Sequence, residues 1–284
     1  MNSTRMTLAV AVAILSTIAS NASAVLVVNP LFETDIVALY PLMEGPDGSA
    51  VTGADDIIDD PTHGATDATP NGGPNNDQWI FDLTRNQVVL DTTDNTSYLA
   101  GTQDIDLNDG FAWSLWVNVA SSNIADPGAD GIIGTRSTPS GQTWHKIDIG
   151  GGPFSGVTQW AGISGNLYTL ADDTWHHLAL VGDLANGVSF YIDGNLIGTD
   201  ATTAATTYTG PLEFGGVSRF GERVTGRYSE IGIWERALTE NEIQALARGV
   251  PLVVDSDSAI PEPATATIAL IGLGGLMMRR RRVA

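Results

Sequence analysis

Short runs of alternating apolar and polar residues make up most of this 284-residue chain, and Gly, Asp, Asn and Pro separate the runs. In one run Phe111, Trp113, Leu115 and Val117 share one face of a strand, whereas Trp116 lies on the other. A period of two residues is typical of β-strands, and helical periodicity is nearly absent. We therefore predict an all-β protein with strands near residues 35–42, 78–82, 87–90, 111–120, 131–135, 144–149, 157–163, 166–170, 175–182, 188–192, 195–199, 212–215 and 227–234.

Residues 239–248 carry the only helical pattern in the body of the chain. Thr239 can cap this helix and Glu242, three residues later, completes a capping box. Two stretches rich in Gly, Pro, Asp and Asn, 44–76 and 121–131, predict surface loops, because such residues favour turns and leave little to bury. Residues 253–259 predict a short acidic linker.

The first 24 residues have the three parts of a secretion signal. Arg5 supplies the positive charge, Met6 to Ile18 are mainly apolar, and Ala22 and Ala24 flank a small-residue cleavage site. We expect the mature chain to begin at Val25. A buried N-terminal helix or strand is the alternative.

The last residues, 260–284, combine three features in order. Two prolines and an acid come first, a short apolar run from 264 to 278 follows, and four arginines end it: Pro261, Glu262, Pro263, Arg279, Arg280, Arg281 and Arg282. The run is shorter than the about 20 residues that cross a bilayer, and arginines stay on the cytoplasmic side. This layout resembles the PEP-CTERM sorting signal, which implies brief insertion in the inner membrane, an exosortase-type sorting enzyme as partner, and delivery to the cell surface or beyond. A permanent tail anchor is the alternative.

Composition narrows the function further. The chain has no cysteine, so no disulfide framework supports an exported fold. Between the two ends lie eight basic and 32 acidic residues, a formal charge of −24, which repels nucleic acid and anionic membranes. This acidity is explained by solubility or by an affinity for divalent cations. The length of 25–252 suits one large β-sandwich domain.

Three stretches, together with an opening strand at 38–42, resemble the LamG-like jelly roll of the concanavalin A-like lectin/glucanase superfamily: 111–117 (FAWSLWV), 173–196 (with DTWHHLALV and SFYIDGNL) and 226–243 (GRYSEIGIWERALTENEI). The resemblance implies a sandwich of two antiparallel sheets. Where such proteins often have an Asp before the acid of the last strand, this chain has Ser229 before Glu230. Core packing is the default explanation for Trp116 and Trp175.

Catalytic patterns are weak. Some members of the superfamily hydrolyse glycosides with two carboxylates on one strand, and Glu230 and Glu235 are the nearest match. In a regular strand an offset of five places them on opposite faces. His176 and His177 also project to opposite faces, which argues against a shared zinc ion. We therefore predict that the protein is not an enzyme.

Binding chemistry is the better expectation. The resemblance implies calcium at a rim of the sandwich, and loop carboxylates suit calcium; the preferred ligands are Asp55, Asp59, Asp172 and Asp173. Aromatic side chains near Asn or Gln can bind sugars, and the candidates are Trp160, Gln159, Asn166, Trp144 and Tyr208. The leading hypothesis is a lectin-like module that binds glycan or exopolysaccharide. A structural matrix protein with protein partners and a glycoside hydrolase are the alternatives.

Overall fold

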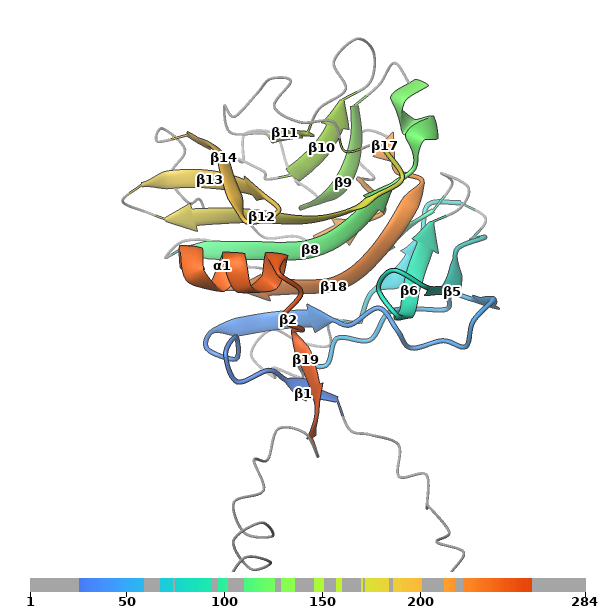
Figure 1. The fold of residues 1–284 in the computed structure, drawn as a ribbon. Helices are drawn as coiled ribbons and strands as arrows, with labels where there is room; N and C mark the ends of the chain where they lie inside the picture. The colour runs from blue at the N-terminus through green and yellow to red at the C-terminus, as the bar shows by residue number, and fades with distance from the viewer. Residues whose placement is uncertain are drawn as a thin grey trace, which may run out of the picture.

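The computed structural model describes residues 26–58, 67–73, 75–92, 97–101, 110–125, 129–135, 146–150, 157–159, 170, 172–183, 186–200, 212–217 and 222–256. These residues form two antiparallel sheets that face each other, as Figure 1 shows. The expectation of an all-β sandwich with one short helix is confirmed.

The larger sheet has nine strands. Its order is β14-β13-β12-β8-β18-β6-β5-β3, and β2 pairs with one end of β18. The strands are β2 (Ile36–Tyr40), β3 (Ser49–Ala50), β5 (Gln78–Asp82), β6 (Gln87–Thr92), β8 (Phe111–Val119), β12 (Trp175–Asp183), β13 (Gly187–Ile192), β14 (Asn195–Asp200) and β18 (Gly226–Trp234).

The smaller sheet has six strands in the order β11-β10-β9-β15-β7-β4. They are β4 (Thr69–Asn71), β7 (Tyr98–Ala100), β9 (Ala129–Thr135), β10 (Lys146–Gly150), β11 (Val157–Gln159) and β15 (Leu212–Phe214). Two short pairs complete the fold, β16 (Gly216–Val217) with β17 (Glu222–Arg223) and β1 (Leu26–Val28) with β19 (Val253–Asp255). A 3₁₀ helix, η1 (Ser121–Ala125), follows β8.

The main core lies between the two sheets. Val117 on β8, Leu178 on β12 and Tyr228 on β18 are buried there, together with Phe214 of the smaller sheet. Because side chains alternate along a strand, the neighbours of these residues point to the outer face of the larger sheet. That outer face carries the second hydrophobic cluster and, further along the same strands, the polar residues of the candidate site.

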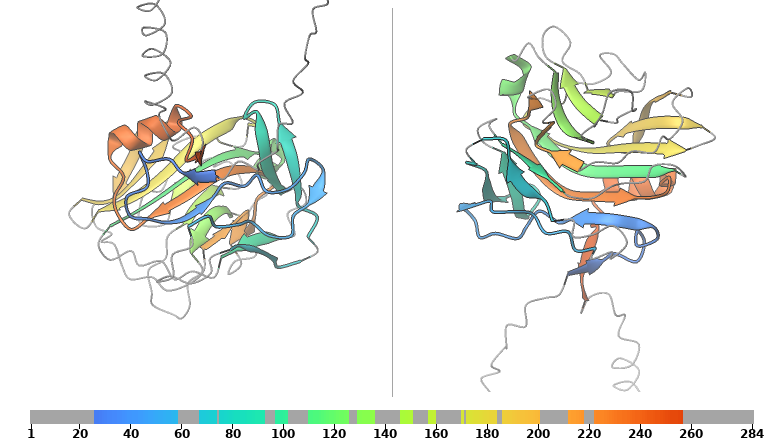
Figure 2. Two further views of the ribbon diagram at one scale, coloured as in Figure 1. Left: turned by 90° about the horizontal axis from the view of Figure 1, so that it is seen from below. Right: turned by 180° about the vertical axis from the view of Figure 1, so that it is seen from behind.

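The helix α1 (Glu240–Ala247) covers one end of the outer face. Ile243 and Leu246 on α1 are buried against Trp234 of β18. The predicted capping box is confirmed: the Thr239 hydroxyl accepts a hydrogen bond from the Glu242 amide, and the Glu242 carboxylate accepts one from the Thr239 amide. In Figure 2, left, α1 and the β5–β6 hairpin (teal) lie at opposite ends of this face.

β18 changes partners halfway along its length. Residues 226–228 pair with β6, and residues 231–234 pair with β2. Between them the register with β8 shifts, so that Ser229 lies opposite Trp116 and Gly232 lies opposite Ser114. This β-bulge contains Glu230, which has a positive φ of 52°.

The two predicted loops and the predicted linker are partly structured, and the loop 121–131 contains η1 and the first residues of β9. The stretch 44–76 contains β3 and β4 and buries Val51, Ala54 and Ala68, so the expectation that it has little to bury is wrong. Its residues 59–66 and 74 lie outside the described residues. The predicted linker begins with β19, where Asp255 pairs with Leu26; its last residues, 257–259, are not described. The first and last described strands therefore lie side by side (Figure 1).

Candidate functional site

One row of side chains crosses the uncovered end of the outer face. Asn118 on β8 pairs with Trp175 on β12 and with Arg227 on β18, and Arg227 pairs with Asp91 on β6. Residues paired in this way point to the same face, and neighbouring strands lie about 4.8 Å apart. An aromatic ring, an amide, a guanidinium and a carboxylate are thus aligned across four strands.

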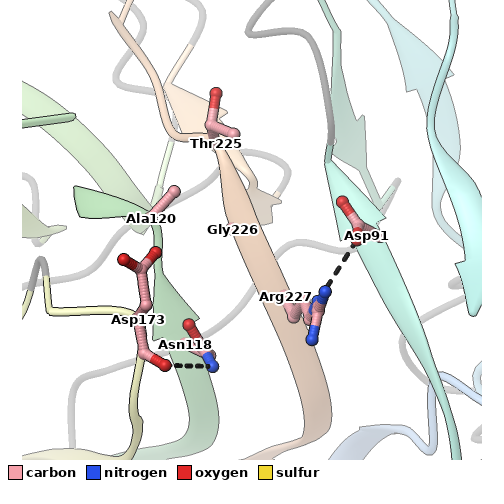
Figure 3. Close-up of a pocket in the computed structure, with 7 residues that line it drawn as sticks. All are labelled: Asp91, Asn118, Ala120, Asp173, Thr225, Gly226 and Arg227. Carbon is pink, nitrogen blue, oxygen red and sulfur yellow. Dashed lines mark hydrogen bonds and ion pairs between the residues drawn. The ribbon is translucent and has the colours of Figure 1, made fainter. Parts of the chain in front are cut away.

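A pocket of about 280 Å³ opens over this row and is lined by Asp91, Asn118, Ala120, Asp173, Thr225, Gly226 and Arg227 (Figure 3). Asp173 lies on one wall, and Asp91 and Arg227 lie on the opposite wall. Gly226 forms the base, where an added Cβ would lie 2.6 Å from the Asn118 carbonyl oxygen. Only glycine allows this close approach of β18 to β8.

Hydrogen bonds hold both walls in place. The Asn118 side-chain amide donates to the Asp173 carbonyl at 3.1 Å, and the Asp173 carboxylate accepts from the Ser121 amide at 3.0 Å. Across the pocket Arg227 donates to Asp91 at 3.3 Å and to Asp82 at 3.0 Å. The pocket is therefore built from groups that can both donate and accept hydrogen bonds.

Arg85, from the turn between β5 and β6, lies over the aromatic residues beside the pocket. Its guanidinium is 4.3 Å from the Trp116 ring centre and 5.8 Å from that of Trp175. Glu230 fixes Arg85 by an ion pair of 2.6 Å and also accepts the amide of Leu252 at 3.3 Å. Burial raises the pKa of Glu230 even though Arg85 lowers it. Contacts with the guanidinium hold Trp116 in one orientation.

A buried histidine lies beside Trp116 on the same face of the sheet. His177 pairs with Trp116 across β12 and β8, and their rings meet edge to face at 5.4 Å. Ser114 Oγ lies 2.8 Å from His177 Nε2. Burial lowers the pKa of His177 to about 3, so this ring is neutral and packs as part of the support.

His176, on the other face of β12, joins three polar side chains. Its Nδ1 lies 2.8 Å from Asp193, and its Nε2 lies 3.0 Å from Thr174 Oγ1 and 3.3 Å from Asp172. Thr174, His176 and Asp193 have the spacing of a nucleophile, base and orienting acid. However, the Thr174 hydroxyl donates to Asp172 at 2.7 Å, and the hydrogen bond with Asp193 raises the pKa of His176 despite partial burial. The Thr174 hydroxyl proton is thus directed to Asp172 and not to the imidazole, and these contacts hold the side chains in place.

Glu230 and Glu235, the carboxylate pair considered for hydrolysis, make different structural contacts. The bulge that the sequence did not indicate places Glu230 in its ion pair with Arg85, with 4% of the residue exposed. Glu235 follows the end of β18, and its amide donates to the Asp35 carbonyl at 2.9 Å. A buried, paired carboxylate is poorly placed to attack a sugar.

Most of the predicted ligand-binding residues lie outside the described part of the chain: Trp160, Asn166, Trp144 and Tyr208. Gln159 ends β11 at the edge of the smaller sheet. The sequence interpretation of Trp116 and Trp175 as core residues is wrong, since both are half-buried on the outer face. The sequence did contain a signal for the outer-face position of Trp116, because Trp116 and Asn118 alternate with Val117, which is buried.

The predicted calcium ligands do not gather within the described residues. Asp172 contacts Thr174 and His176, and Asp173 lies at the pocket wall. Asp55 lines a separate hollow of about 570 Å³ near β3, and Asp59 is not described. No group of three or more acidic, His or Cys side chains that could hold a metal ion occurs in the described residues. Calcium remains a prediction.

A two-sheet jelly roll with a polar, tryptophan-bearing outer face defines a lectin-like sandwich. The family model of the concanavalin A-like lectin/glucanases superfamily matches residues 91–244, which is more than half of the chain, and the protein belongs to this superfamily. The PEP-CTERM protein-sorting motif matches residues 259–282 and marks the chain for export. No curated protein matches the sequence. No helix in the described ranges is long and apolar enough to cross a membrane.

Solved structures share the fold at low identity. Domain 4 of AbnA, a GH43 extracellular arabinanase from Geobacillus stearothermophilus in complex with arabinotriose, has a TM-score of 0.54 and 19% identity, and the match covers 75% of this chain and 98% of that one. The binding domain of Paraclostridial Mosquitocidal Protein 1 has a TM-score of 0.50, 14% identity and coverage of 75% and 52%. Trypanosoma rangeli sialidase in complex with the inhibitor DANA has a TM-score of 0.50, 13% identity and coverage of 75% and 32%. The chain thus spans about half of the second and a third of the third.

Proposed function

We propose that this protein is an exported cell-surface or extracellular-matrix protein that binds glycan or exopolysaccharide without hydrolysing it. The alignment of Trp175, Asn118, Arg227 and Asp91 across four strands carries the proposal. Sugars present an apolar face that stacks on aromatic rings and hydroxyl groups that need both donors and acceptors. The pocket supplies the donors and acceptors, and Trp175, paired with Asn118 on the neighbouring strand, supplies the aromatic ring beside it.

Several features support binding rather than catalysis. In the described residues, the two arrangements that resemble catalytic groups are held in structural contacts: Glu230 by Arg85 and His176 by two aspartates. We expect no release of reducing sugar from any polysaccharide offered to the protein. Release that disappears on replacing Glu230 or Glu235 would make the protein a hydrolase instead.

The chain ends supply the location. We propose that residues 1–24 are removed on export, that 25–252 form the binding domain, and that 260–284 lodge briefly in the inner membrane until an exosortase-type enzyme processes them. The sorting motif at 259–282 supports this sequence of events. Mass spectrometry of the mature protein tests it: the expected species lacks both ends, whereas a species that keeps residues 264–282 indicates a permanent anchor.

Binding is tested by retention on the producer's own exopolysaccharide, with and without calcium, and on a glycan array. We expect the mature protein to be retained and Trp175→Ala to reduce retention at least tenfold. Trp160→Ala is the matched control, because it removes the aromatic ring favoured from sequence alone. Loss of binding only in Trp160→Ala would move the site to the smaller sheet, and no retention in any condition would overturn the proposal.

A second candidate function, attachment to protein partners in a matrix, is favoured by one observation. Phe81 and Leu83, at the β5–β6 hairpin, are 45% and 87% exposed. Both residues come from one hairpin, and exposed apolar side chains that form a contiguous patch mark interaction surfaces. Leu83→Ser would then release the protein from the matrix while leaving sugar binding unchanged.

A further inference from the structure

The charges that line the proposed glycan pocket are unbalanced. Two carboxylates, Asp91 and Asp173, and one cation, Arg227, line it. Arg227 already contacts Asp91 and also Asp82, which is 4% exposed. One guanidinium therefore faces two carboxylates, and with Asp173 these groups carry a net negative charge.

Asp173 stands apart from this cation. Its carboxylate accepts the Ser121 amide, and among the described residues it forms no ion pair. Asp173 is exposed on the wall opposite Arg227, as Figure 3 shows. A second hydrogen bond to this carboxylate can come from a ligand, because an ionised carboxylate accepts up to about four.

The wall around Asp91 also favours a cation. Burial raises the pKa of Asp91, although Arg227 acts to lower it. Burial therefore destabilises the ionised carboxylate more than Arg227 stabilises it. Another positive charge nearby would stabilise the ionised form. The whole chain, with a formal charge of −20, attracts cations and repels anions before contact.

We infer that this pocket takes a sugar that carries a protonated amine, such as a hexosamine unit of a deacetylated polysaccharide, and that Asp173 is its specificity-determining residue. The inference rests on the proposed glycan binding and narrows it to a chemical class. The amine pairs with Asp173, the hydroxyl groups reach Asn118 and Asp91, and the sugar face lies toward Trp175. Uronate and sulfated polymers are repelled.

The pocket volume limits how much of a polymer enters. At about 280 Å³ it lies just below the usual range of ligand pockets, which is about 300 to 1,000 Å³. One sugar unit enters the pocket, and the rest of the polysaccharide runs over the four aligned strands. Asp173 is exposed, and exposed ion pairs contribute about 0.2–1 kcal/mol, so one amine pair is worth up to about a fivefold gain in affinity.

Titration calorimetry on the mature protein tests this inference with four probes: a glucosamine hexamer, its N-acetylated counterpart, a neutral glucose hexamer and a galacturonate hexamer. We expect the glucosamine hexamer to bind about twofold to fivefold more tightly than the two neutral ones, the galacturonate hexamer not to bind, and the preference to weaken with added salt.

Asp173→Asn is the decisive variant. Asn tolerates the positive φ of 60° at this position and keeps an acceptor for the Ser121 amide. It should bring the glucosamine affinity down to that of the neutral hexamers and leave their affinity unchanged. Asp47→Asn, an exposed aspartate outside the pocket, is the matched control.

The outcomes separate the two proposals. Equal binding of amine-bearing and neutral hexamers, or tighter binding of galacturonate, would overturn the amine preference and leave glycan binding standing. A preference for glucosamine that survives in Asp173→Asn would overturn the role of that residue. Failure of all four hexamers, together with the producer's polysaccharide, would overturn both.

Discussion

The ion pair between Arg85 and Glu230, next to Trp116, predicts a large effect of a small substitution. Glu230→Gln keeps the shape of the side chain and an acceptor for the Leu252 amide, but it leaves the Arg85 charge without its partner. The two side chains are 14% and 5% exposed. Charges about 4 Å apart attract by about 4 kcal/mol at an effective dielectric constant of about 20. Breaking a buried pair costs about 3–5 kcal/mol.

The same pair predicts a response to pH. In Arg85→Met the buried Glu230 carboxyl can take up a proton, because burial already raises its pKa. An acid whose pKa is raised by folding loses stability as the pH rises through that raised value. We therefore expect Arg85→Met to be mildly destabilised near pH 5 and more strongly near pH 8. The double variant should lose less than the sum of the two single losses.

Urea unfolding monitored by tryptophan fluorescence measures these differences in the free energy of unfolding, and thermal melting measures them as changes in Tm. In a domain of 150–250 residues each kcal/mol lowers Tm by about 2–4 °C, so Glu230→Gln should melt about 10 °C below the wild type. Glu33→Gln and Arg248→Met, the same kinds of change at exposed positions, are the controls. A Glu230→Gln midpoint no lower than that of Glu33→Gln, or losses that simply add in the double variant, would refute this reasoning.

Three further predictions concern stability and metal. Burial lowers the pKa of His177 to about 3, so the stability from its neutral ring is full above pH 6.5 and is lost as the pH falls toward 3. Over that range the free energy of unfolding of the wild type should fall by about 4 kcal/mol. The His177→Gln variant should lose much less, and urea midpoints measured at each pH would show the difference. Thr239→Ala removes the helix cap and should cost about 1 kcal/mol, against no change in exposed Asn241→Ala, by the same assay. Calcium should raise Tm in the wild type but not in a variant with Asn at Asp55 and Asp59, and a wild-type Tm that calcium does not move refutes the metal site.

Local patterns in the sequence predicted the longer strands and the helix, but not the short strands β1, β3, β4, β7, β16, β17 and β19. Alternation placed β5 within its observed bounds, and the capping box predicted the start of α1. Asp193 and Gly194 both have positive φ, at 50° and 77°, as a tight hairpin between apolar runs requires. Such features depend on neighbouring residues only, which is why the sequence indicates them.

The candidate site depends on long-range register instead. Trp175, Asn118, Arg227 and Asp91 come from four separate strands, and no local signal says that they align. Alternation did show that Trp116 lies opposite the core face, but not that α1 covers only the other end of the outer face. The bulge at Glu230 was also missed, because an acid at positive φ carries no turn signal.

Hydrogen–deuterium exchange with bound polysaccharide tests the location of the site most directly. We predict that the ligand protects the amides of 116–118 in β8, 173–176 at the start of β12 and 225–229 in β18. Protection confined to 144–168 or to Tyr208, where the sequence alone placed the sugar, or no protection at all on a polysaccharide that retains the protein, would contradict a binding site on the outer face of the larger sheet.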